Sequence, residues 1–177
     1  MTLRYPLPGG AVLETYYTRL DQALMLWSGV TAIIFLIAQF SYLDWHTQAI
    51  ADSALTASAT SVTGKLAWSW ATARKARWVI GLWSVLMLSA IALSDYGIVA
   101  GNSLILQHLC TGWLGVCALG YWVTAIGMQS RALTLIAIVH LCAMFLVRTI
   151  LAWQFFLTGS VLTLSLCLLG TLQWDHR

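Results

Sequence analysis

At 177 residues the chain has the length of one ordinary domain, but 60% of its residues are hydrophobic and only 8% are charged, with a mean hydropathy of +0.81. A soluble domain carries about 25% charged residues, so this composition excludes one. The net charge of +3 comes from small basic clusters, which argues against nucleic acid as a partner because phosphate binding needs a continuous basic face. The composition predicts an all-α integral membrane protein that contacts the lipid bilayer and the helices of other membrane proteins.

Residues 1–21 are predicted to form an N-terminal interfacial segment. Pro6–Gly10 is incompatible with a helix, whereas Ala11–Asp21 has apolar residues at mixed helical spacing, with Tyr16 and Tyr17 suited to headgroup depth. Arg4 is not followed by the apolar core of a cleavable signal peptide. We therefore expect a short interfacial helix, followed by a first span that stays in the mature protein.

About five apolar stretches are long enough to cross a bilayer, since a helix needs roughly 20 residues to cross ~30 Å of hydrocarbon. The first transmembrane helix is predicted over residues 22–43, and residues 78–177 are predicted to form a four-helix transmembrane region. The four expected spans of that region are Trp78–Ser94, Ser103–Gly127, Ala132–Ala152 and Phe155–Trp174. The predicted fold is a helical bundle of about five transmembrane helices, within a range of four to six.

The number of transmembrane spans, five or six, depends on whether residues 44–77 contain one. Ala, Ser and Thr dominate Thr47–Ala73, and Asp52 and Lys65 lie inside it. A charged residue of either kind costs roughly 2.5 to 3.5 kcal/mol at the centre of a membrane helix. We therefore expect a polar and basic connecting segment at the surface, with a weak sixth span as the alternative.

Basic residues predict which loops face the cytoplasm, because short cytoplasmic loops gather Lys and Arg. By this rule the loops at Arg74–Arg77 and Arg131 lie on the cytoplasmic side. With five spans the N-terminus then lies outside. With six spans, Arg4 and Arg19 lie inside.

Three ionisable side chains fall inside the predicted spans, namely His108, His140 and Arg148. Such groups are costly in hydrocarbon and are therefore the first places to look for function. His108 shares a helix face with Gly112 and Gly115, which would let a neighbouring helix or a flat ring approach closely. Helix packing is the simpler interpretation of this groove, and a cofactor site is the alternative.

The two histidines lie on consecutive antiparallel spans, an arrangement that suggests a haem or a chlorophyll. The predicted bounds place His108 ~7.5 Å from the outer end of its span and His140 ~18 Å below the same surface. One haem held by both is disfavoured, because two axial ligands should lie at similar depth. Each histidine could still hold a separate pigment or form a hydrogen bond within the bundle.

Arg148 is expected at nearly the depth of His108, and Asp95 ends the preceding outward span on the same side. These three residues predict a polar cluster in the outer leaflet. In it, Arg148 either pairs with Asp95 or extends to the headgroups.

The ten tryptophans are best explained as interfacial anchors where they fall at the ends of apolar segments. Four of them lie deeper, where bulky packing or a hydrophobic cofactor would explain them equally well: Trp27, Trp83, Trp113 and Trp122.

No motif points to an enzyme, since the chain has no Gly-x-Ser-x-Gly, no His-Glu-x-x-His and no phosphate loop, and its six acids fall at termini or predicted interfaces. We predict no catalytic residue and no metal site. The predicted function is a non-enzymatic accessory subunit or assembly factor of a membrane complex. The alternatives are a haem- or pigment-binding redox subunit using His108 and His140, and a small-solute channel or carrier.

Overall fold

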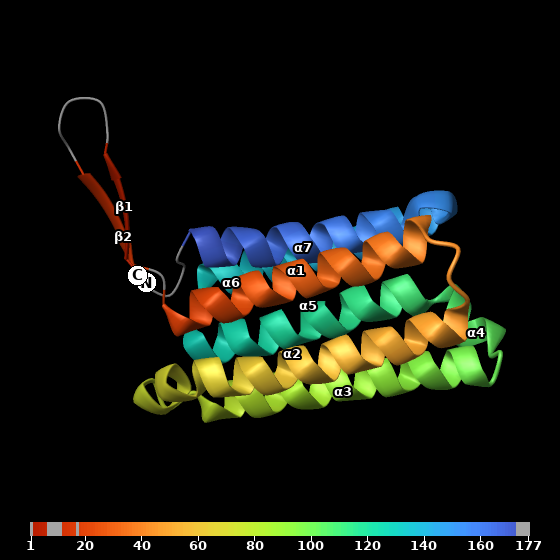
Figure 1. The fold of residues 1–177 in the computed structure, drawn as a ribbon, viewed down its shortest axis with the longest axis horizontal. Helices are drawn as coiled ribbons and strands as arrows, with labels where there is room; N and C mark the ends of the chain where they lie inside the picture. The colour runs from red at the N-terminus through yellow and green to blue at the C-terminus, as the bar shows by residue number, and fades with distance from the viewer. Residues whose placement is uncertain (1, 7–11, 17, 173–177) are drawn as a thin grey trace.

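In a computed structural model the described part of the chain folds into a bundle of six long helices preceded by a short β-hairpin (Figure 1). The structure describes residues 2–6, 12–16 and 18–172. The long helices are α1 (Arg19–Phe40), α2 (Trp45–Ala73), α3 (Arg77–Val99), α5 (Leu109–Met128), α6 (Arg131–Thr149) and α7 (Gln154–Thr171). A short helix, α4 (Ser103–Gln107), lies between α3 and α5, and one 3-10 turn, η1 (Leu151–Trp153), precedes α7.

Side-chain caps fix where several helices begin. At α1 the Asp21 N–H donates to Thr18 Oγ1 at 3.1 Å, and the Thr18 N–H donates to Asp21 Oδ2 at 2.8 Å. This reciprocal pair is a capping box, which satisfies two otherwise unpaired groups. Asp44 caps α2 by accepting from the Thr47 N–H, and Ser130 caps α6. The long helices follow one another after short connections, and successive long helices are antiparallel neighbours.

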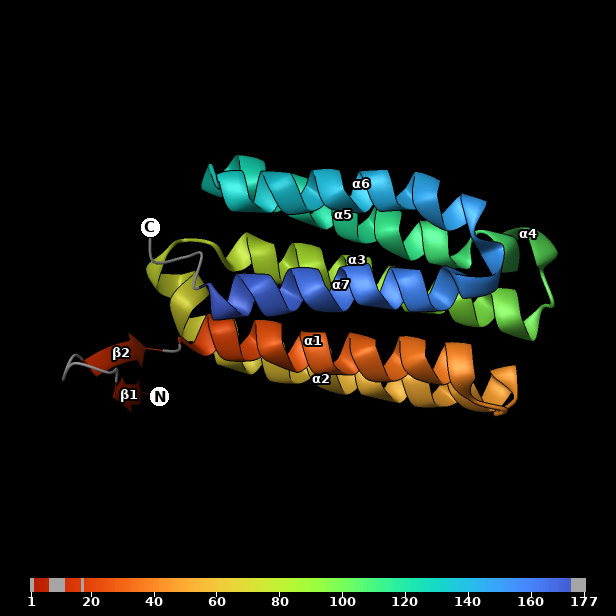
Figure 2. The ribbon, with the colours of Figure 1, turned by 90° about the horizontal axis from the view of Figure 1, so that it is seen from above.

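The six long helices form a closed ring. Each long helix packs against the next one in the chain, and α7 packs against α1 (Figure 2). Along the bundle, α1, α3 and α6 run in one direction and α2, α5 and α7 in the other (Figure 1). Helix α5 also contacts α7 across the ring.

Glycines allow the closest helix contacts, as expected where lipid gives no hydrophobic drive between helices. A Cβ added to Gly120 in α5 would lie 2.8 Å from the indole of Trp83 in α3. A Cβ added to Gly159 in α7 would collide with Phe35 of α1. These contacts hold α3 against α5 and α1 against α7.

Five of the described helical stretches are long and apolar enough to cross a membrane: α1, α3, α5, α6 and the stretch Leu151–Thr171. This confirms the prediction of an all-α membrane bundle with about five such helices. The predicted span Ser103–Gly127 is interrupted at His108, which ends α4 and precedes α5. Asp95, expected at the end of a span, lies inside α3.

Most of the predicted connecting segment over residues 44–77 is helical in the structure. Trp45–Ala73 is one continuous helix of 29 residues that packs against both α1 and α3. It returns the chain to the end of the bundle where α1 begins (Figure 1). Helix α2 can pack closely against α1 and α3 because it carries a stripe of small side chains at helical spacing. This stripe includes the buried Ala49, Thr56, Ala59 and Ala67.

The interfacial helix predicted over Ala11–Asp21 is also wrong in part. Val12–Tyr16 forms strand β2, antiparallel to strand β1 (Thr2–Pro6), with Thr2 opposite Tyr16. Only the last residues of the predicted helix belong to α1. Tyr17, Trp174 and the final three residues lie outside the described residues.

Candidate functional site

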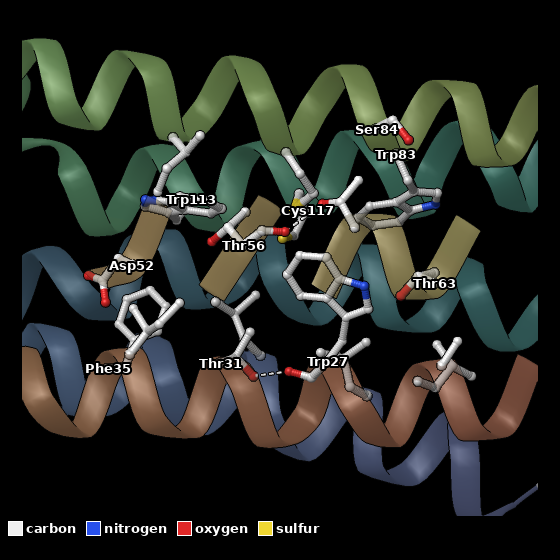
Figure 3. A pocket seen from close by; sticks show the side chains of 18 of the residues that line it. Trp27, Thr31, Phe35, Asp52, Thr56, Thr63, Trp83, Ser84, Trp113 and Cys117 are labelled. Carbon is white, nitrogen blue, oxygen red and sulfur yellow. Dashed lines mark hydrogen bonds between the residues drawn. The ribbon is translucent and has the colours of Figure 1, made fainter. Parts of the chain in front are cut away.

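A cavity of about 210 Å³ lies between the helices of the ring. Side chains from α1, α2, α3, α5 and α7 line it (Figure 3). Its lining follows α2 from Gln48 to Trp70, which are ~33 Å apart along the helix axis at ~1.5 Å per residue. The lining therefore extends over a length close to the ~30 Å of a hydrocarbon core.

Aromatic side chains form much of the cavity wall. Trp27 of α1, Trp83 of α3 and Trp113 of α5 point into it (Figure 3). The Trp83 indole N–H donates to Thr124 Oγ1, and the Trp113 indole N–H donates to Ser94 Oγ, each at 3.2 Å. These bonds fix both rings. Three of the four deep tryptophans thus face the cavity, whereas Trp122 is exposed on the outside of the bundle.

Two carboxylates stand at one end of the cavity, Asp52 from α2 and Asp95 from α3. Ser53 Oγ donates to Asp95 Oδ2 at 2.6 Å, which ties α2 to α3. The other oxygen, Asp95 Oδ1, is buried and has no hydrogen-bond partner among the described residues. Asp52 lies close enough to Asp95 for their negative charges to interact.

The opposite end of the cavity also presents unpartnered polar atoms. Thr63 Oγ1 and Trp70 Nε1 are buried, line the cavity and have no partner among the described residues. A buried polar atom without a partner costs about 1–3 kcal/mol. The cavity therefore has hydrogen-bonding capacity at both ends, separated by a mostly apolar wall.

The structure divides the predicted cluster of Asp95, His108 and Arg148 into two. Arg148 Nη2 lies 3.3 Å from His108 Nε2, and His108 Nδ1 lies 3.0 Å from the Leu104 carbonyl oxygen. Because a guanidinium only donates, His108 Nε2 accepts and Nδ1 carries the proton. Asp95 is bonded to Ser53 instead.

His140 is fully buried where α6 packs on α5. Its Nδ1 donates to the Ile136 carbonyl oxygen at 2.8 Å, its ring centre lies 5.2 Å from that of Tyr121, and its Nε2 has no partner among the described residues. His140 does not line the cavity. It precedes Arg148 by eight positions, or ~12 Å of helix, so the two histidines lie at different depths in the bundle.

Gly112 and Gly115 have different surroundings. A Cβ on Gly112 would meet no atom within 4 Å, whereas one on Gly115 would lie 3.5 Å from Met144 Cε of α6. Gly115 therefore lies at the contact between α5 and α6, with room for a Cβ at ordinary van der Waals distance. Across the described residues, no three His, Cys, Asp or Glu side chains gather in a way that could hold a metal ion.

The inner face of α2 has a sequence signal in its helical spacing, since Gln48, Asp52, Thr56, Thr63 and Trp70 recur every three or four residues or multiples of that interval. The charges of Asp52 and Lys65 instead favour a surface segment and conceal that face. No protein-family model, curated protein or solved structure matches the chain, so the functional conclusion rests on the geometry of the cavity.

Proposed function

We propose that this polytopic membrane protein crosses the membrane six times and binds a small, mostly apolar solute inside its helix ring, in the manner of a carrier. The observation that carries the proposal is the cavity, which follows one face of α2 over ~33 Å. Ligand sites in membrane bundles lie between helices, and their few polar groups fix the orientation of the ligand. The unpartnered polar atoms at the two ends of the cavity have this character.

The length of α2 supports a sixth crossing. Its 29 residues extend ~43 Å, so a ~30 Å hydrocarbon core centred on the helix leaves ~6 Å outside at each end. Asp52 and Lys65 are ~20 Å apart along the axis. Each then lies only ~5 Å from a boundary, and the exposed Lys65 can extend its amine to the headgroups. The cost assumed for a charge at a helix centre does not apply to either.

The distribution of charge supports the cytoplasmic position of one end. The bundle end at which α1 begins carries the bases of the two predicted cytoplasmic loops together with the first residue of α1: Arg19, Arg74, Lys75, Arg77 and Arg131. The opposite end holds Asp44 and, as its base, Arg148. By the rule that cytoplasmic loops gather Lys and Arg, the first end faces the cytoplasm in a six-span arrangement.

The test is to fill the cavity. Gly64 of α2 lines it and has no atom within 4 Å of an added Cβ, so Gly64→Phe places a ring in the cavity. Gly81 of α3 has the same free space but is exposed, so Gly81→Phe is the matched control. The probe is neopentylbenzene, titrated against the full chain in lipid nanodiscs by tryptophan fluorescence and thermal unfolding.

The parent protein and Gly81→Phe should bind the probe saturably, and a ligand at 100 times its Kd stabilises the folded state by about 2.7 kcal/mol. Gly64→Phe should lose both the fluorescence change and the stabilisation. Binding that survives in Gly64→Phe, or an absence of binding to the parent protein, would refute the proposal.

The accessory-subunit and pigment-binding functions stay predictions. Large apolar side chains such as Val85, Leu135 and Phe145 cover the outside of the ring, as contact with lipid alone requires. For a pigment, His108 Nε2 already accepts from Arg148, whereas His140 Nε2 is unpartnered but closed off by packing.

A further inference from the structure

We infer that the solute bound in the cavity is an organic cation, with its charged group between Asp52 and Asp95 and its apolar body against the tryptophans. This inference rests on the proposed function and names the chemical class of its ligand. It is carried by the combination of an aromatic-lined cavity between the helices, two carboxylates at one end of it and a buried carboxylate oxygen that has no partner among the described residues.

Among the described residues, no positive charge pairs with the carboxylates at this end of the cavity. The charge that acts on Asp52 is the like charge of Asp95, and no ion pair joins either carboxylate to a base within residues 18–172. The base near this end of the bundle, Arg148, is bonded to His108. Two carboxylates close enough for their charges to interact repel each other, and a cation between them removes that repulsion.

Aromatic rings lie at this end as well. Asp52, Trp113 and Phe35 appear at the same end of the cavity in Figure 3, and all three side chains line it. Trp113 is held by its bond to Ser94, the residue next to Asp95 in α3. Faces of aromatic rings attract cations, and rings grouped with carboxylates recognise amines and quaternary ammonium groups.

The remaining wall determines the rest of the ligand. Beyond the carboxylates it is mainly apolar, with Trp27, Trp83 and Leu162 among its members. A hard inorganic cation takes six or more oxygen ligands, which this wall does not offer. An apolar cavity of about 150 Å³ accepts benzene, so the 210 Å³ available here suits one ring that carries an ammonium group.

The experiment compares two probes of the same shape. Benzyltrimethylammonium carries the positive charge, and neopentylbenzene replaces its nitrogen by carbon. Both are titrated against the full chain in nanodiscs, in parallel with Asp52→Asn and Asp95→Asn. Asp44→Asn is the matched control, because it removes one negative charge at the same end of the bundle, outside the cavity, and keeps a side chain that caps α2.

The parent protein should bind the cation at least tenfold more tightly than the neutral probe. Each of Asp52→Asn and Asp95→Asn should weaken cation binding on the order of 10- to 100-fold and change neutral binding by less than about twofold. Asp44→Asn should change neither. Asp52 accepts no hydrogen bond from a described residue, so Asp52→Asn breaks no bond within the bundle. If Asp95→Asn does not fold, the comparison is made with Asp52→Asn alone.

Two failures are distinguishable. If the neutral probe binds and Gly64→Phe abolishes that binding, but the cation binds no more tightly or is insensitive to Asp52→Asn, the inference of a cationic ligand is overturned and the proposed function stands. If neither probe binds the parent protein, the proposed function itself fails.

Discussion

Removing the hydrogen bond between Ser53 and Asp95 tests whether α2 packs against α3 as the structure shows. The bond is 2.6 Å long, and it leaves the second oxygen of Asp95 without a partner among the described residues. Ser53→Ala therefore removes the one hydrogen bond that this carboxylate accepts from the described residues. A bond to a charged group stabilises by about 1.5–3 kcal/mol, whereas interhelical bonds in membranes average about 0.6 and reach about 1.7 kcal/mol. We expect a coupling energy of about 1.5 kcal/mol, where these ranges meet.

The assay is a double-mutant cycle of Ser53→Ala and Asp95→Ala, measured by reversible unfolding in mixed detergent micelles. Ser53→Ala should destabilise the parent protein but have almost no effect when Asp95 is already alanine. Ser61→Ala is the control on the same helix, since its hydroxyl bonds to the Ala57 carbonyl of its own helix and its loss should cost less than about 0.5 kcal/mol. A coupling energy below about 0.5 kcal/mol, or equal losses for Ser53→Ala and Ser61→Ala, would refute the packing of α2 on α3.

Two further predictions concern the helix contacts and the cap of α2. Gly120→Ala should lower the free energy of unfolding by about 1–3 kcal/mol, because its Cβ meets the Trp83 indole. Gly112→Ala should raise it by about 0.5–1 kcal/mol, since its Cβ meets nothing within 4 Å and the change replaces a helical glycine. Unfolding in detergent measures both variants, and similar effects would contradict the packing of α3 on α5. The bond from the Thr47 hydroxyl lowers the pKa of Asp44, so the stability it contributes is present above its ordinary pKa and is lost as pH falls through the lowered value. Asp44→Ala should therefore lower the unfolding temperature at pH 7 and match the parent protein in strong acid; a difference that is independent of pH would exclude this role.

The five apolar helices were predictable because length and hydropathy alone determine them. Helix α2 was not, because the penalty for Asp52 and Lys65 bears on whether the segment enters the membrane and not on whether it is helical. That penalty depends on depth, and depth depends on where a 29-residue helix is placed, which the segment alone does not specify. The small side chains of its inner face can be recognised as packing residues only once α1 and α3 are known to lie against them.

In the candidate site, too, contacts that depend on how helices pack against each other could not be predicted from single segments. His108 and Arg148 were expected at similar depth and do meet, because both positions follow from counting residues along helices. The approach of Asp52 to Asp95 depends on how α2 is turned against α3, which no local pattern contains. The hairpin had a local signal, because Leu-Pro-Gly-Gly-Ala separates two five-residue runs in the manner of a turn between strands. The mixed helical spacing after Gly10 favours a helix instead and conflicts with that signal.

We propose that α2 crosses the membrane as the sixth member of the ring, and cysteine accessibility tests this crossing most directly. Tyr42→Cys lies in the exposed turn between α1 and α2, and Ala73→Cys lies at the exposed far end of α2. Each is placed in a chain whose native cysteines, Cys110, Cys117, Cys142 and Cys167, are changed to alanine, and is treated with a membrane-impermeant maleimide on sealed vesicles of known orientation. A six-span ring predicts that the Tyr42→Cys variant is labelled only from the outer side and the Ala73→Cys variant only from the cytoplasmic side; labelling of both from the same side would contradict it.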